Sequence, residues 1–259
     1  MRILFIGDIV GRPGREIIRT ALWKLREREG LDAVIANGEN AAGGSGLTPR
    51  ICGELFEYGV DIITSGDHIW KKQEIYEYLD STDRLIRPAN YPTGAPGRGA
   101  TAVNIGKAGR IGVVNLLGRV FMDAVDCPFM CVRREINELR KETAVILVDM
   151  HAEATSEKCA MGWFLDGSVS AVIGTHTHIQ TADEKILPGG TAYITDCGMT
   201  GPYDSVIGRK KEPVLKRFLT QLPTRFEMAD EGIEMHGVIV DIDAKTGKAL
   251  GIKRVQEKA

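Results

Sequence analysis

The chain has 259 residues, of which 43% are hydrophobic and 26% charged, a composition that is ordinary for a globular enzyme. The formal net charge is -2 without a long basic run, which does not favour bulk nucleic-acid binding through phosphate contacts. No apolar run approaches the roughly 20 residues of a membrane span, and the short apolar N-terminus lacks a signal-peptide cleavage site. We therefore expect a cytoplasmic protein that does not contact a membrane, with a single domain over residues 1–259 and five reduced, packing cysteines.

The first third of the chain predicts alternating strands and helices. Strands are expected at 2–9, 33–37 and 61–65, and helices follow around 17–25, after the Thr48-Pro49 cap and at about 73–79. Such alternation is typical of a parallel sheet, in which ligands lie beyond the carboxyl ends of the strands. The polar residues at these three strand ends are Asp8, Glu39, Asn40, Asp67 and His68.

The rest of the chain predicts further strands, three helices and a terminal hairpin. After a loop rich in proline and glycine at 87–99, strands are expected at 101–105, 110–116, 143–149, 169–173 and 191–195. Helices are expected at 130–140, 156–164 and 213–222, and a β-hairpin at 232–243 and 249–255. We also expect the three tryptophans, Trp23, Trp70 and Trp163, to be buried anchors.

Histidines gather at the predicted strand ends. His151 follows one strand, and His176 and His178 follow the next in Gly174-Thr175-His176-Thr177-His178. On an extended segment, side chains two residues apart point to the same side, so both imidazoles should face one pocket. The donors are carboxylate, amide and imidazole without thiolate, a set that suits iron, manganese or zinc and argues against a closed structural zinc site. There are too many donors for one tetrahedral ion, whereas two ions about 3.5–4 Å apart, bridged by a carboxylate, would use them all.

These motifs resemble the calcineurin-like metallophosphoesterases, and most closely their YmdB-type subgroup. The resemblance covers almost the full length and is carried by Asp8, Gly38-Glu39-Asn40, Gly66-Asp67-His68, His151 and the 174–178 motif, with 7–11, 87–92 and 195–202. It implies an α/β fold, a metallophosphoesterase-type sandwich of two mixed β-sheets flanked by helices.

The resemblance also implies a role for each matching residue. Asp8, Asn40 and His178 would hold one metal ion; Asp67, His151 and His176 would hold a second; and Glu39 would bridge them. His68 would be the catalytic residue that donates to the phosphate or protonates the leaving oxygen. The chain departs from the superfamily at Val10, where a histidine is usual, and at Asp67, where an asparagine is usual. The carbonyl oxygen of Asn40 would replace the missing histidine ligand.

The implied activity is phosphodiester hydrolysis by a hydroxide held between two metal ions. Cyclic nucleotides such as 2′,3′-cyclic AMP are the expected substrates, and iron is the favoured metal, with manganese or zinc as alternatives. Arg98 and Arg119 are candidate phosphate contacts because they lie in glycine-flanked loops. A metal-dependent nucleotide sensor that acts by binding is the alternative function, and a phosphomonoesterase or nuclease is a weaker one. A homo-oligomer is left open.

Overall fold

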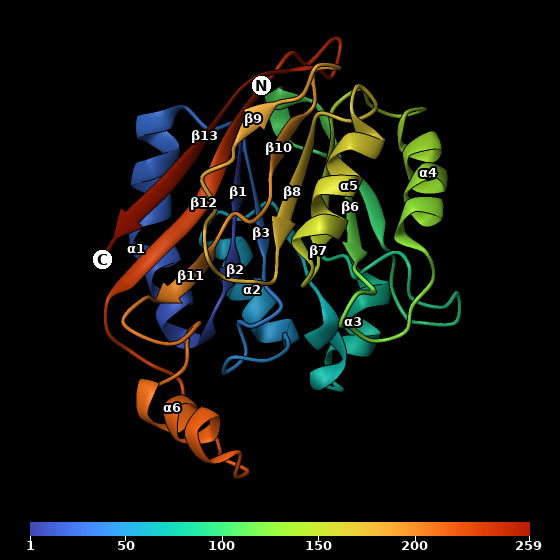
Figure 1. Ribbon diagram of the computed structural model, residues 1–259. Helices are drawn as coiled ribbons and strands as arrows, with labels where there is room; N and C mark the ends of the chain where they lie inside the picture. The colour runs from blue at the N-terminus through green and yellow to red at the C-terminus, as the bar shows by residue number, and fades with distance from the viewer.

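Two mixed β-sheets pack face to face in the computed structural model, which describes residues 1–259 apart from the side chain of Lys107 (Figure 1). The first sheet has the order β2-β11-β12-β1-β3-β4, with β13 paired to β12. Strand β1 runs parallel to β3 and antiparallel to β12, so the sheet joins segments from both ends of the chain. Its strands are β1 (Arg2–Ile6), β2 (Asp8–Ile9), β3 (Ala33–Asn37), β4 (Ile62–Thr64), β11 (Met199–Pro202), β12 (Ile233–Ile242) and β13 (Ala249–Lys258).

The second sheet has the order β5-β6-β7-β8-β10-β9. Its four inner strands are parallel, and the edge strands β5 and β9 pair antiparallel to their neighbours. The bounds are β5 (Ala100–Asn104), β6 (Arg110–Leu117), β7 (Ile146–His151), β8 (Ala171–Thr175), β9 (Lys185–Ile186) and β10 (Ala192–Ile194).

Helices cover the outer faces of both sheets. Helices α1 (Gly11–Glu29), α2 (Pro49–Glu57) and α3 (Ile75–Ser81) pack on the first sheet, and α4 (Pro128–Leu139) and α5 (Thr155–Leu165) pack on the second. Two short 3-10 helices are η1 (Asp67–Lys71) and η2 (Gly106–Ala108). In the part of the chain that the structure describes, no helix combines the length and apolar character that crossing a membrane requires.

Alternation along each strand builds the layers. In β1, Phe5 faces the second sheet in a core shared with Leu147 and Ile173, whereas Leu4 faces α1 and α2. Because the central strands are buried on both faces, they carry nearly continuous apolar sequences. The predicted sandwich of two mixed sheets flanked by helices is therefore confirmed.

Several sequence-based boundaries needed correction. The single strand predicted at 2–9 is divided at Gly7, where a Cβ would lie 1.9 Å from the carbonyl oxygen of Gly198. This contact lets β1 pair with β12 while β2 pairs with β11, a strand that was not predicted. Trp23 and Trp163 are exposed, so their prediction as buried anchors is wrong.

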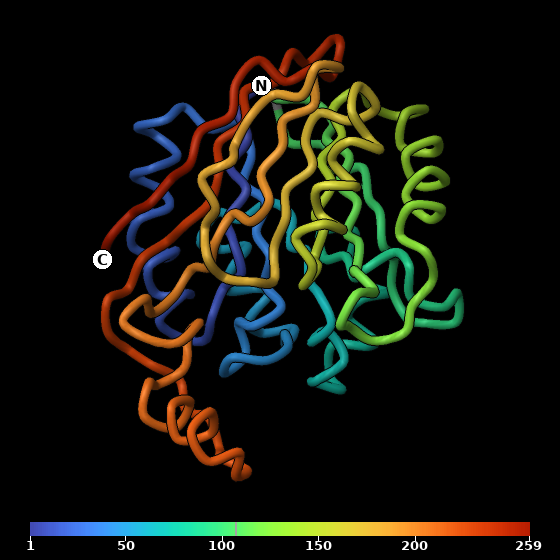
Figure 2. Tube along the Cα trace, in the orientation of Figure 1, coloured from blue at the N-terminus to red at the C-terminus, as the bar shows by residue number. Residues whose placement is uncertain are grey.

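Helix α6 (Lys211–Thr220) projects from the body of the molecule, as the trace in Figure 2 also shows. Val214 is the buried residue of this helix, whereas Leu215, Phe218 and Leu219 are exposed apolar side chains. The segment between β11 and β12 therefore forms an arm beside the sandwich.

Replacing Gly174 with alanine should strongly destabilise the protein. Gly174 lies in β8, and an added Cβ would stand 1.7 Å from the backbone oxygen of Thr195. Because backbone cannot yield as a side-chain tip does, we expect a loss of about 3 kcal/mol or more in the free energy of unfolding. Urea denaturation followed by circular dichroism measures this loss.

Gly53→Ala is the matched control, because a Cβ at Gly53 in α2 meets nothing within 4 Å. It should raise stability by about 0.5–1 kcal/mol through helix propensity. Equal midpoints for the two variants would show that β8 and the segment at Thr195 are not held as close as described.

Candidate metal centre

Polar residues from both sheets meet at one edge of the sandwich. Asp8 begins β2, Glu39 and Asn40 form the turn after β3, and Asp67 and His68 begin η1 after β4. From the second sheet, His151 ends β7, and His176 and His178 follow β8. The structure thus brings together the side chains that were predicted at the strand ends: Asp8, Glu39, Asn40, Asp67, His68, His151, His176 and His178.

Two groups of metal-ligating side chains share one carboxylate. In each group, the ligand atoms lie within 4.8 Å of one another. His151 Nε2 lies 3.1 Å from Glu39 Oε2 and 3.3 Å from Asp67 Oδ1, and His176 Nδ1 lies 3.0 Å from His151 Nε2. The first group is Glu39, Asp67, His151 and His176, and the second is Asp8, Glu39 and His178.

Hydrogen bonds on the far side of His176 and His178 orient both rings. His176 Nε2 lies 3.2 Å from Glu153 Oε2, and His178 Nδ1 lies 3.1 Å from the backbone oxygen of Ile207. Both partners can only accept, so these nitrogens carry the protons. The lone pairs of His176 Nδ1 and His178 Nε2 therefore point toward the ligand groups.

A buried network fixes His151 in the same way. Thr175 Oγ1 donates to Asp149 Oδ1 at 2.6 Å and lies 2.8 Å from His151 Nδ1. Since Thr175 has one proton and gives it to the carboxylate, His151 Nδ1 must be the donor to the threonine oxygen. Nε2 of His151 consequently faces Glu39 and Asp67. Asp149 is held in turn by Asn37 and Thr64, at 2.9 and 2.5 Å.

Buried oxygens at the centre lack the partners that they need. Asp8 Oδ1 and Asp67 Oδ1 are buried, and neither accepts a hydrogen bond from the described part of the chain. Such atoms are costly unless an ion or another donor satisfies them. A hard or borderline cation bound by carboxylate and imidazole would satisfy both, so the donor set fits a metal centre.

The pKa shifts have the same origin. Burial, together with the charge of Glu39, raises the pKa of Asp8 well above its ordinary range. Burial alone would lower the pKa of His151, but Glu39 and Asp67 raise it well above the usual value. Burial and the charge of His151 lower the pKa of His176 to about 4, which keeps that imidazole neutral and able to bind a metal. The carboxylates therefore hold a proton on His151 where a cation would otherwise serve.

The backbone at the two histidines differs from the prediction. His176 and His178 have φ values of 95° and 66°, so the segment is not extended, and the side chains converge because the chain bends. Positive φ is uncommon outside glycine and persists where neighbouring contacts impose it. Here Asp196 Oδ2 accepts from Thr177 N at 3.0 Å, from Thr177 Oγ1 at 2.6 Å and from Lys158 Nζ at 2.8 Å.

Asn40 lies at the centre with its amide turned away from the predicted orientation. Its Oδ1 accepts from His68 Nδ1 at 2.8 Å, while Nδ2 lies 2.7 Å from Glu39 Oε1 and 3.2 Å from His178 Nε2. To offer the carbonyl oxygen to a metal, as the sequence led us to expect, the amide would have to turn over.

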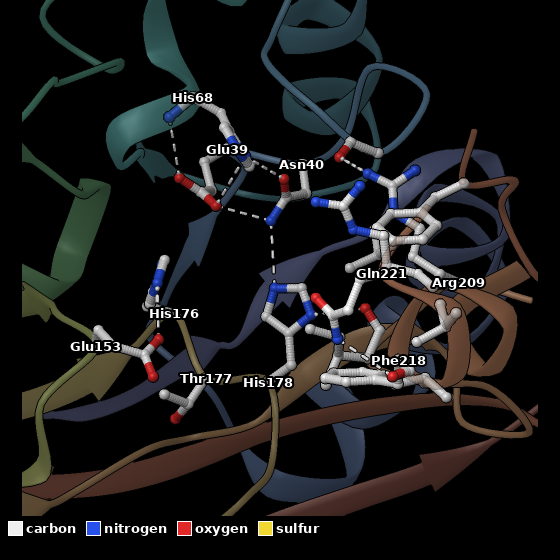
Figure 3. A pocket seen from close by; sticks show the side chains of 17 residues that line it. Glu39, Asn40, His68, Glu153, His176, Thr177, His178, Arg209, Phe218 and Gln221 are labelled. Atoms are coloured by element: carbon white, nitrogen blue, oxygen red, sulfur yellow. Dashed lines mark hydrogen bonds and ion pairs between the residues drawn. The ribbon is translucent and has the colours of Figure 1, made fainter. Parts of the chain in front are cut away.

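A cavity of about 630 Å³ opens beside these residues (Figure 3). His68, His176 and His178 form its polar side. Among the described residues that line the cavity, Arg98 and Arg119 are absent: both are exposed elsewhere, so the proposed phosphate contacts are not in place. The arginines that do line it are Arg209 and Arg217, which sequence reasoning missed because the arm that carries them has no motif.

Known proteins resemble the chain along its whole length. The family model described as YmdB-like protein matches residues 4–255. A protein of Bacillus subtilis (strain 168) named 2′,3′-cyclic-nucleotide 2′-phosphodiesterase is 51% identical over 256 residues, covering 98% of this chain and 96% of the relative. A hypothetical protein from Thermus thermophilus has a crystal structure that is 42% identical, with a TM-score of 0.93 and coverage of 100% and 99%. A novel phosphatase from Mycoplasma pneumoniae is 34% identical, with a TM-score of 0.93 and coverage of 100% and 93%.

Removing the outer partner of His176 should weaken metal binding. Glu153 was not predicted from the sequence; its only signal is its position two residues after His151. In Glu153→Ala, His176 loses the acceptor that fixes its ring, and we expect about 10-fold weaker binding of one metal equivalent. Competition with a chromophoric chelator measures the affinity independently of activity. Glu138→Ala, on the exposed face of α4, should bind metal as the unmodified protein does. Equal affinities in both variants would contradict the role given to Glu153.

Proposed function

The chain belongs to the YmdB-like protein family, and from this premise we propose that it hydrolyses 2′,3′-cyclic nucleotides at a centre of two metal ions. The observation that carries the proposal is the pair of ligand groups that share Glu39. The Bacillus subtilis relative supplies the substrate class, because its name specifies the 2′ ester of a 2′,3′-cyclic nucleotide. Hydrolysis of that ester leaves a nucleoside 3′-phosphate.

The residues of the two groups would hold the ions. Asp8, His178 and Asn40, once its amide has turned over, would bind one; Asp67, His151 and His176 would bind the other; and Glu39 would contact both. Ions bound there would supply the Lewis acidity that activates water and withdraws charge from the phosphoryl oxygens. Iron is the metal we propose, with manganese and zinc as alternatives, since nitrogen and oxygen donors without thiolate accommodate all three.

His68 is suited to move a proton at the cavity. It is partly exposed, lines the cavity, and anchors its Nδ1 on Asn40 at 2.8 Å. The hydrogen bond and charge of Glu39 raise the pKa of His68, so its protonated form persists to higher pH. A proton on His68 can pass to the leaving ribose oxygen, the role of a general acid.

A turnover assay separates this function from a sensor that only binds. Purified protein would be loaded with iron, manganese or zinc, its metal content measured by elemental analysis, and 2′,3′-cyclic AMP added. Catalytic release of a nucleoside monophosphate supports the proposal. Stoichiometric binding without release would instead support a regulatory protein, and faster release from simple monoesters would indicate a phosphomonoesterase.

The shared carboxylate provides the sharpest single substitution. Glu39→Gln removes the charge that both ligand groups use while keeping the shape of the side chain. We expect roughly a 10²-fold or greater fall in kcat, because a neutral amide bridges two cations poorly. Rate and metal content are measured together, with Glu138→Gln as the control. Full activity with two equivalents of metal would rule out Glu39 as the bridge.

Removing His68 should affect proton transfer but not metal content. His68→Ala should retain metal and lose roughly 10²–10⁴-fold in rate on 2′,3′-cyclic AMP, the usual contribution of a general acid. A nitrophenyl phosphodiester should be affected less, because its leaving group needs no proton. If this variant loses metal, His68 is a ligand and the division of roles is wrong.

A further inference from the structure

The cavity continues past the metal centre to a wall built by α6 and the loop after it. Val214, Phe218, Gln221 and Phe226 line this wall. In Figure 3, Phe218 and Gln221 lie on the side of His178, across the opening from His176 and Glu153. The cavity therefore has a polar end, where the ligand groups converge, and an apolar end carried by the arm.

Phe218 is unusually exposed for an aromatic side chain that lines a cavity. It is 71% exposed, and Phe226 is 42% exposed. A large aromatic ring in this position contributes little to the core, and the space beside it is open to a ligand. Ligand sites combine apolar and aromatic walls with a few polar groups, and Gln221 supplies both a donor and an acceptor at this wall.

The wall itself is fixed to the body near the metal centre. Arg209 NH2 donates to the backbone oxygen of Gly44 at 2.7 Å, and the backbone oxygen of Ile207 accepts from His178 Nδ1. Because Ile207 and Arg209 lie just before α6, a ligand at the centre and one against Phe218 would be held at a defined spacing.

We propose that the arm forms the nucleobase subsite, in which Phe218 stacks on the base of the cyclic nucleotide and Gln221 contacts the base edge. The inference rests on the proposed function and deepens it. In a 2′,3′-cyclic nucleotide, the phosphate and the base are carried by one ribose. A phosphate at the polar end therefore places the base one sugar away, toward one of the cavity walls. A phosphate alone would leave most of the 630 Å³ empty, and the apolar α6 wall offers it nothing.

The test compares a substrate that has a base with one that lacks it. Methyl riboside 2,3-cyclic phosphate keeps the reacting ring of 2′,3′-cyclic AMP and replaces the base by a methoxy group. Stacking of one base on an aromatic side chain contributes about 1–3 kcal/mol, which corresponds to roughly 5- to 150-fold. Phe218→Ala should lower kcat/KM by this factor for 2′,3′-cyclic AMP, mainly through KM, and leave the base-free substrate unchanged.

Two variants serve as controls. Phe218→Tyr keeps the ring and should restore the preference for the substrate with a base. Leu219→Ala removes the neighbouring apolar side chain on α6, which is 83% exposed and is not among the described cavity-lining residues, and should leave both substrates unaffected. Equal losses on the two substrates in Phe218→Ala, or no loss on either, would overturn the subsite.

Binding of 2′,3′-cyclic AMP, followed by calorimetry in the same variants, distinguishes this failure from failure of the proposed function. If the unmodified protein binds but does not hydrolyse the nucleotide, the proposed function fails. Weaker binding by Phe218→Ala would then still support the subsite. Equal affinity in Phe218→Ala and the unmodified protein would overturn it, whether or not turnover occurs.

Discussion

Negative charge buried at one edge of the sandwich is the constraint on which the rest of the structure depends. Asp8, Glu39, Asp149 and Asp196 are all almost inaccessible to solvent. A buried carboxylate without compensation costs several kcal/mol, so each requires its own solution. Asp196 is paired with the buried Lys158, and Asp149 is surrounded by hydroxyl and amide donors. Asp8 and Glu39 are faced mainly by histidines, and this difference separates structural acids from acids that are suited to bind a cation.

The same acids allow the chain to adopt a backbone that it would otherwise avoid. Left-handed conformations at His176 and His178 cost about 1–3 kcal/mol each. Asp196 offsets this cost by accepting two hydrogen bonds from Thr177, the residue between them, at 3.0 and 2.6 Å. The Asp196–Lys158 pair therefore acts on the metal centre through geometry. The core stabilises the sheets, while the buried ion pair determines where two imidazoles point.

The sequence predicted the composition of the site better than its geometry. Strand ends are readable from apolar runs, and parallel strands deliver their ends to one edge, so the set from Asp8 to His178 could be assembled without coordinates. The two-sheet sandwich came from the family resemblance, because periodicity does not reveal which strands pair. Local patterns also could not reveal Glu153, the bend at His176 or the orientation of the Asn40 amide, which depend on contacts between distant segments. The apolar spacing of α6 looks like that of an ordinary buried helix, yet Phe218 is exposed beside the cavity.

The position of β1 has a consequence for synthesis. This strand lies between β3 and β12, and Arg2 pairs opposite Asp241, almost the full chain away. A ribosome delivers β1 first and β12 nearly last, so one edge of β1 stays unpaired during most of translation. Asp8, which follows β1 and pairs opposite Met199, cannot reach its final place until the late strands β11 and β12 arrive. Nascent chains consequently lack a complete set of ligands, and the metal centre forms only once the polypeptide is nearly whole.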